Sequence, residues 1–246
     1  YYKKLNTFVF KQISSKINTM VVSISVICIM LFFTLCLLSS TFTIKNYFNN
    51  SINKYAPADF ELIKYYYNQN KVSDEDMLNL INNDIELKNN INLTIINEYY
   101  DENMLYKESL GNYYLELKNK SPFANYNSKV EIISQSDYNK ISKLFNLDEI
   151  TLKDNEYVIV SNYEKEIYDE VMNRKSIINI FGKELTPALN KSIEGFVKIS
   201  GNPTNMGFFV VPNNVIDSNS ENNKILIGNY SITDKDKINY IENKLK

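Results

Sequence analysis

The sequence predicts an α+β protein in which one transmembrane helix is followed by a mixed α/β extracellular domain with two βαβ-like units and additional β-strands. Three observations lead to this prediction. A run without any charged side chain extends from Ile17 to Ile44. After it, a strand, a helix and a strand are predicted twice in the same order, each time with a Ser-x-x-Asp cap before the helix. Four more apolar runs follow, separated by Gly, Pro and Asn turn signals.

The apolar run is long enough to cross a membrane. Its centre, Met20 to Phe42, is 23 residues, which at about 1.5 Å per residue spans roughly 35 Å of helix. A run of this length without Gly, Pro or charge argues against buried strands and favours a spanning helix over the core helix of a soluble domain. It exceeds the apolar part of a signal peptide, and no A-x-A-like cleavage site follows it. We therefore predict a transmembrane helix over residues 20–42.

The charges on either side of the run predict its orientation. Four lysines and no acidic residue precede it: Lys3, Lys4, Lys11 and Lys16. The rest of the chain contains the remaining 23 of the 27 basic residues and all 29 acidic residues, so it carries a net charge of −6. By the positive-inside rule we expect a cytoplasmic N-terminal end and an extracellular domain over residues 43–246.

The segment 1–19 has two interpretations. Val9, Ile13, Ile17 and Met20 follow one helical stripe with lysines between them, which favours an amphipathic helix on the inner membrane surface that turns into the spanning helix. A solvated tail is the alternative.

The first part of the outer domain reads as strand, helix and strand. We predict a strand at 58–63, a helix at 73–85 capped by Ser73 and Asp76, and a strand at 91–100. The polar and aromatic stretch 101–128 is expected to form loops and a hairpin.

The same order is predicted in the second part. Its elements are a strand at 129–134, a helix that ends near 146 and is capped by Ser134 with Asp137, and a strand at 156–161. Together the two parts predict a βαβ-type pseudo-repeat.

The C-terminal part is predicted to contain a helix at 164–175, four β-like runs and a closing helix. The runs are 176–185, 192–200, 206–212 and 224–231. Thr233 is the expected N-cap of the closing helix. We expect the sequence to be a segment of a longer membrane protein.

The composition excludes several kinds of site. The chain has no His, so the usual base of a catalytic triad and His-ligated metal sites are excluded. Its six Gly form no phosphate-binding loop, and its one Arg, Arg174, makes nucleic-acid recognition improbable. The acids 74–76 lie in a predicted first helical turn, where the helix dipole explains them. We therefore expect no catalytic residue, no cofactor and no metal site.

Clustered tyrosines are the candidate ligand-facing residues. They are Tyr65, Tyr66, Tyr67, Tyr99, Tyr100, Tyr113 and Tyr114. Exported tyrosines can stack on sugars or pack against amphipathic peptides. Because side chains of adjacent strand residues point to opposite faces, core packing explains about half of each run without any ligand.

Several strings resemble permease subunits of the FtsX/MacB-like superfamily of ABC transporters, and among these the bacitracin-export (Bce) type of low-GC Gram-positive bacteria. They are FKQISSKINT ahead of the spanning helix, then ISQSDYNKISKLFN, LKDNEYVIV, INIFGKEL, MGFFVVPNNVI and ILIGNYS. The resemblance covers most of residues 5–240.

The resemblance implies a plasma-membrane protein with ten spanning helices, in which residues 20–42 are the seventh and the extracellular domain precedes the eighth. It implies a cytoplasmic ATPase partner that hydrolyses ATP, often a sensor histidine kinase, and a role against antimicrobial peptides that target lipid-linked cell-wall precursors. Two alternatives stay open: a membrane-anchored extracellular sensor domain, and an FtsX-like scaffold that regulates a cell-wall hydrolase.

Overall fold

The computed structural model describes residues 2–55, 57–66, 71–120, 122, 125–161, 165–199 and 207–245. The chain divides into two compact units, residues 1–52 and 53–246, which are described separately below.

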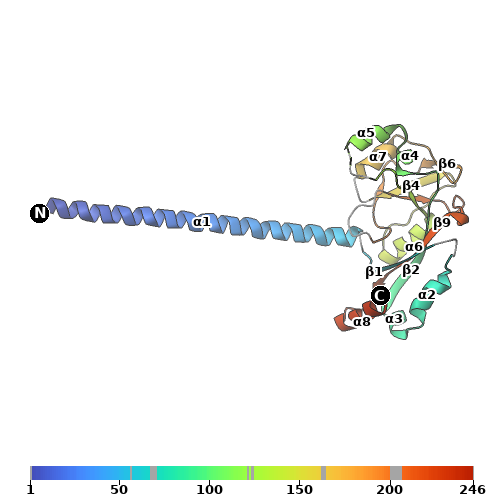
Figure 1. Ribbon diagram of the computed structural model, residues 1–246, viewed down its shortest axis with the longest axis horizontal. Coiled ribbons are helices and arrows are strands. Elements are labelled where there is room, and N and C mark those ends of the chain that lie inside the picture. The colour runs from blue at the N-terminus through green and yellow to red at the C-terminus, as the bar shows by residue number, and fades with distance from the viewer. Residues whose placement is uncertain are drawn as a thin grey trace. The chain divides into compact units, whose positions relative to one another are not determined.

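The first unit consists of a single helix, α1 (Tyr2–Tyr55), whose last residues continue into the second unit. Figure 1 shows α1 as one uninterrupted ribbon, without a turn between the predicted amphipathic and spanning segments. The apolar side chains in its middle are exposed: Met20, Phe33 and Leu37 are 64%, 60% and 68% exposed. By length and composition, α1 is suited to cross a membrane.

The second unit is a mixed sheet with helices packed on it. Its α-helices are α2 (Asp74–Asn82), α3 (Ile85–Asn90), α4 (Tyr106–Leu110), α5 (Tyr114–Lys120), α6 (Gln135–Phe145), α7 (Lys165–Asn173) and α8 (Lys235–Leu245). Short 3₁₀ turns cover Gly111–Tyr113 and Ser218–Ser220. Its strands are β1 (Phe60–Tyr65), β2 (Ile91–Tyr99), β3 (Glu131–Ser134), β4 (Glu156–Ser161), β5 (Ile178–Ile180), β6 (Lys183–Pro187), β7 (Ile193–Glu194), β8 (Phe208–Val211) and β9 (Glu221–Tyr230).

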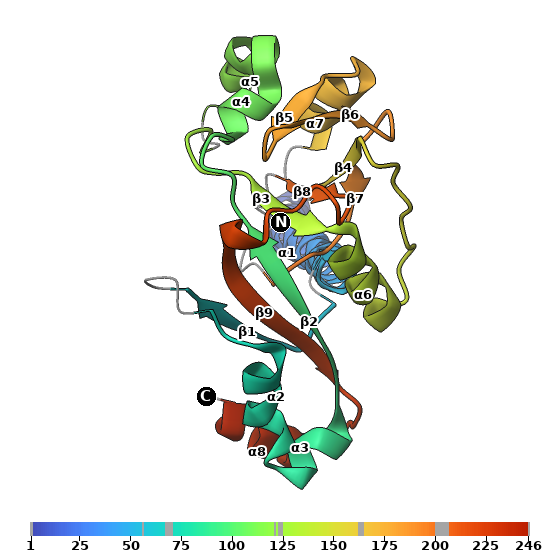
Figure 2. The same cartoon turned by 90° about the vertical axis from the view of Figure 1, so that its right-hand side faces the viewer.

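The first predicted βαβ unit is present in a split form. The strand order is β1-β9-β2-β3-β8-β4-β6-β5, with β7 beside β4. Strand β9 pairs antiparallel with both β1 and β2, so β1 and β2 run parallel with β9 between them. In Figure 2 these three strands form a long twisted ribbon with α2, α3 and α8 at its lower end.

The prediction of a second βαβ unit is wrong. Strand β3 pairs parallel with β8, whereas β4 pairs antiparallel with β8, so β3 and β4 run in opposite directions. The order strand, helix, strand does not fix strand direction, and β8 enters between β3 and β4 from a later part of the chain. The predicted pseudo-repeat is therefore absent from the sheet that the structure describes.

Helix caps confirm some predictions and correct others. The Ser73 and Asp76 capping box is complete, and the Ser134 hydroxyl accepts from the Asp137 amide at 3.0 Å. The predicted helix 73–85 ends at Asn82, because Asp84 caps a separate helix, α3. The closing helix begins at Lys235, and the carboxylate that accepts from its first amides belongs to Asp234, one residue after the predicted Thr233.

Two other stretches differ from their predictions. Residues 101–128 contain α4 and α5 in place of a hairpin, because Tyr106, Leu110 and Tyr126 bury apolar surface against α7 and its neighbours. Of the predicted run 192–200, the described residues 192–199 contain the two-residue strand β7 and no longer strand. The run 176–185, predicted as a single β-like run, forms a hairpin of β5 and β6, with Phe181 and Gly182 both at positive φ in its turn.

Three apolar clusters hold this unit together. The first, with Tyr157, Tyr168 and Phe209, packs α4 and α7 on one end of the sheet. The second, with Ile96, Ile141 and Phe208, lies under α6 and is called the central core here. The third, with Phe60, Ile95 and Leu226, packs under α2, α3 and α8. Alternating side chains of β1, β2 and β9 thus enter the central core on one face and the third cluster on the other.

Candidate functional site

Three glutamates from three strands converge on one face of the sheet. Glu61 lies on β1, Glu98 on β2 and Glu131 on β3. Each lies two residues from an isoleucine that packs into the central core: Ile63, Ile96 and Ile133. Because strand side chains alternate between faces, the three carboxylates share the face of the central core.

Lys198 and Ile199 cover these carboxylates. Lys198 Nζ lies 3.1 Å from Glu98 Oε1 and 2.6 Å from Glu131 Oε1, and 5.0 Å from the centre of the Phe208 ring. The amide of Ile199 donates to Glu61 Oε2 at 2.5 Å. We call Glu61, Glu98, Glu131 and Lys198 the acidic cluster. It holds three carboxyl groups and a single ammonium group.

Two buried acceptor atoms of this region have no hydrogen-bond donor among the residues described. Glu98 is fully buried, and its Oε2 is unpartnered although its Oε1 meets Lys198. Asn223 on β9 is 1% exposed, and its Oδ1 is also unpartnered. Glu98 and Asn223 are direct cross-strand partners, so their side chains are neighbours on one face. Burying a polar atom without a partner is costly, so this pair indicates that a donor group belongs here.

Burial and mutual repulsion make the cluster retain protons. Burial raises the pKa of Glu61 to about 7, against the opposing effects of the Ile199 amide and Lys198. Burial and the charge of Glu98 raise the pKa of Glu131 to about 7. Burial alone would lower the pKa of Lys198, but the attraction of Glu98 and Glu131 outweighs it and raises that pKa. Near neutral pH, Lys198 is therefore charged while Glu61 and Glu131 are partly protonated.

We expect the free energy of unfolding to fall as the pH rises from about 5 to about 8, because carboxyls with raised pKa values bind more protons in the folded state than in the unfolded one. The pKa values of Asp76, Asp84 and Glu156 are lowered, so these groups titrate below this window. Urea unfolding of the full chain in detergent, followed by tyrosine circular dichroism, measures the effect. A Glu61→Gln, Glu131→Gln double variant should flatten the profile; a wild-type profile that rises with pH would contradict the assignment.

A cavity of about 420 Å³ opens beside Glu61 at the edge of the sheet, a volume within the usual range for ligand pockets. Its acidic lining is Asp59, Glu61 and Glu242, and its apolar lining includes Phe60, Leu62, Ile199 and Leu245. Since β1 ends the strand order, we call it the edge cavity. Its combination of carboxylates and apolar side chains suits a ligand that is both cationic and apolar.

A larger cavity, of about 610 Å³, lies by the β5–β6 turn. Its buried acid, Asp101, accepts from the amides of Asn103 and Phe181 at 2.9 and 2.6 Å, and Asp217 accepts from the Asn219 amide at 2.9 Å. These carboxylates hold turns in place, so this cavity offers a ligand fewer unsatisfied groups than the acidic cluster does.

The six described tyrosines among the seven candidates are not gathered at one place. Tyr65 is 52% exposed on β1, and Tyr100 is half-buried and electrostatically coupled to Tyr65, Glu98, Glu131 and Lys198. These two therefore lie near the acidic cluster, where burial raises the pKa of Tyr100 and keeps it neutral.

Four of the other tyrosines contact neighbouring residues of this unit, and the fifth lies outside the described residues. Tyr66 donates to Glu221 at 2.7 Å, and Tyr99 is buried in the first apolar cluster. The Arg174 guanidinium carbon lies 4.1 Å from the centre of the Tyr113 ring, and Tyr114 packs edge-on against Tyr126. Tyr67 lies outside the described residues.

The acidic cluster was not predicted from the sequence, because its carboxylates belong to single glutamates 33 or more residues apart. A signal was nevertheless present. Each glutamate stands at a position of its strand where alternation places an inward-facing residue, as in Phe60-Glu61-Leu62-Ile63. A charged residue at such a position needs a partner, but the sequence does not say which one.

No protein-family model matches this chain, and no curated protein matches it. The resemblance to FtsX/MacB-like permeases therefore stays a prediction.

Proposed function

We propose that this chain is part of a permease subunit of an FtsX/MacB-like ABC transporter of the bacitracin-export type, which senses and relieves antimicrobial peptides at the bacterial plasma membrane. In this proposal α1 spans the membrane with its N-terminal end in the cytoplasm, and the mixed α/β unit is extracellular. The chain itself is not an enzyme, because ATP is hydrolysed by a cytoplasmic partner subunit. A sensor histidine kinase is a second proposed partner.

The observation that carries the proposal is the edge cavity with its acidic cluster, on a unit that follows a helix suited to a membrane. Peptides that attack cell-wall precursors at a membrane are often both cationic and apolar. The edge cavity offers carboxylates and apolar side chains together, and the net charge of −6 after the apolar run attracts cations over a distance set by salt.

The continuity of α1 is the physical basis of the proposed coupling between the spanning helices and the extracellular unit. The helix α1 continues past the apolar run to Tyr55 without a break, and a helix transmits displacement along its axis better than a loop does. Rearrangement of the spanning helices, driven by ATP in the cytoplasm, would thereby reach the extracellular unit and release the peptide.

Cells that express the complete permease with its ATPase should survive higher concentrations of a cationic cell-wall-directed peptide than cells with an ATP-hydrolysis-deficient ATPase. The inhibitory concentration of the peptide measures this. Equal sensitivity of the two strains to every such peptide would refute the transport role. Signalling that needs a kinase but no ATPase would favour the sensor alternative, and altered wall hydrolysis without a peptide phenotype would favour the scaffold.

A further inference from the structure

We infer that Glu61, Glu98 and Glu131 form a binding site for a second positively charged group, the ammonium or guanidinium of a basic peptide side chain, and that its binding expels a proton from the acidic cluster. This inference deepens the proposed function and rests on it for the choice of ligand. The site itself is argued below from atoms of this chain.

The cluster has more acceptors than its resident cation can satisfy. Lys198 meets one oxygen of Glu98 and one of Glu131, and among the described residues the donor to Glu61 is the Ile199 amide. An ammonium group offers three N–H donors, and Lys198 uses two of them on these carboxylates. Glu98 Oε2 and Asn223 Oδ1 stay without a donor among the described residues. Two adjacent buried acceptors with no donor are complementary to a donor that comes from elsewhere.

A proton takes the place of that donor in the empty site. Glu98 and Glu131 are neighbours, because one oxygen of each lies within 3.1 Å of Lys198 Nζ. Burial and the charge of Glu98 raise the pKa of Glu131, so this carboxyl group retains a proton near neutral pH. A cation supplies the same positive charge and more donors. Its arrival makes the protonated carboxyl more acidic, and the proton leaves for the solvent.

The surroundings contain no second base or cation to take this role among the described residues. Two titratable groups that interact with the cluster are Tyr100 after β2 and Tyr106 on α4. Burial raises the pKa of Tyr106, whose hydroxyl donates to the Gly207 carbonyl at 2.9 Å. Tyr100 is also neutral, so neither tyrosine neutralises a carboxylate or releases a proton near pH 7.

The edge cavity gives the ligand its path. Glu61 belongs to the acidic cluster and also lines the cavity. Ile199 lines the cavity too, and its backbone amide donates a hydrogen bond to Glu61. A basic side chain that enters between Leu62 and Ile199 would place its stem on apolar surface and its charge at Glu61. Neighbouring apolar residues of a peptide would then meet Phe60 and Leu245. We therefore commit to a peptide with alternating basic and apolar residues as the ligand class.

Binding of a fluorescein-labelled Leu-Lys-Leu-Lys peptide to the full chain in zwitterionic lipid nanodiscs tests the inference, with empty nanodiscs as the blank. We expect about 10-fold tighter binding at pH 8 than at pH 6, because one proton is released for each peptide bound. A pH-indicator dye in weak buffer should report that proton directly. The same peptide with acetylated lysines should not bind.

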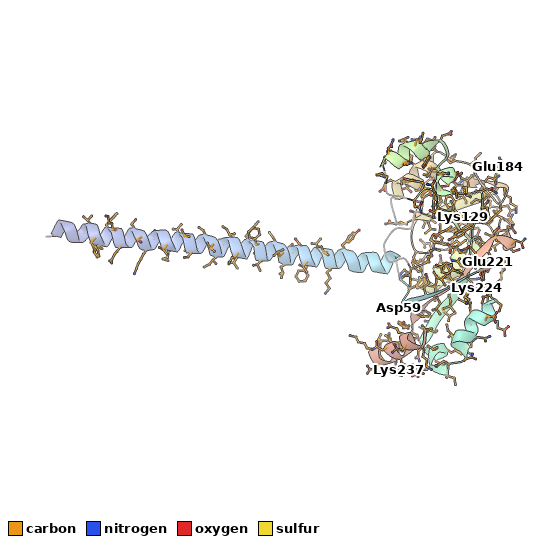
Figure 3. All side chains as sticks on the ribbon, in the orientation of Figure 1. Asp59, Lys129, Glu184, Glu221, Lys224 and Lys237 are labelled. Atoms are coloured by element: carbon orange, nitrogen blue, oxygen red, sulfur yellow. The ribbon has the colours of Figure 1, made fainter. Side chains whose placement is uncertain are left out.

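Two variants locate the site. Glu98→Gln and Glu61→Gln should each weaken binding at pH 8 about 10-fold, since each removes a charged acceptor but keeps its shape. Glu184→Gln is the matched control, because Glu184 is exposed on β6, and Figure 3 shows it near the top of the unit, well apart from Asp59 in the lower half. Circular dichroism confirms that each variant is folded.

Three outcomes would overturn the inference. They are no binding of the lysine peptide, binding without proton release, and a loss of peptide affinity in the Glu184→Gln control as large as in Glu98→Gln and Glu61→Gln. Competition by spermidine as strong as by the peptide would reassign the site to free amines. Because none of these readouts involves cell survival, the site can fail while the permease proposal stands, and the cell assay can fail while the site stands.

Discussion

The Lys198→Met variant is expected to lose about 3 kcal/mol of unfolding free energy at pH 8 and much less at pH 5. Lys198 Nζ is the only ammonium that the structure shows within 4.0 Å of Glu98 and Glu131. Removing it at pH 8 leaves buried carboxylates without a counter-charge. At pH 5 the carboxyls of Glu61 and Glu131, with pKa values of about 7, are already protonated, so much less charge is left unpaired.

Methionine is the informative replacement because it keeps the length of the side chain and its contact with the Phe208 ring. The matched control is Lys129→Met. Lys129 lies 2.6 Å from Glu102, whose side chain is 77% exposed, and an exposed ion pair contributes less than about 1 kcal/mol. Urea unfolding of the full chain in detergent at both pH values measures the difference. An equal loss at pH 5 and pH 8 would show that Lys198 acts through packing and that the charge of the cluster is unimportant.

The sequence was sufficient for elements whose signal is local. The caps at Ser73 and Ser134 depend on residues three positions apart, and the apolar run that became α1 is contiguous. Strands such as β2 and β4 alternate or run apolar over their whole length. The caps and these strands were predicted within a few residues because no distant contact decides them, whereas α1 (Tyr2–Tyr55) extends well beyond the predicted residues 20–42 at both ends.

The rest depends on contacts between distant residues. The direction of β4 relative to β3 is set by β8, about 50 residues later in the chain, and the split of β1 from β2 is set by β9, near the C-terminus. The acidic cluster likewise joins Glu61, Glu98 and Glu131 with Lys198, which follows β7. Tyrosine pairs stood out in the sequence because they are adjacent, yet adjacency in a strand places one ring in the core, as for Tyr99 beside Tyr100.

Gly228→Ala is expected to lower the unfolding free energy by about 3 kcal/mol, because an added methyl group has no space in the middle of the sheet. A Cβ at Gly228 would lie 2.4 Å from Phe60 Cζ and 2.6 Å from the backbone oxygen of Asn92. Gly228 pairs with Phe60 on one side and Leu93 on the other. The backbone of β2 cannot retreat without loss of its hydrogen bonds to β9, and the Phe60 ring is held by stacking on Tyr230 at 5.5 Å.

Gly195→Ala is the control, since its Cβ would first meet Val160 Cγ1 at 3.4 Å, an ordinary contact. Adding Phe60→Leu to Gly228→Ala should recover only part of the loss, because the clash with the Asn92 oxygen persists. Full recovery of the unfolding free energy would instead show that the whole loss comes from the clash with the Phe60 ring. Since Phe60 also lines the edge cavity, the Gly228→Ala variant should shift the wall of that cavity, and we expect weaker binding of the lysine peptide even where the variant stays folded. Unchanged stability would mean that β1 and β9 are not paired in this register.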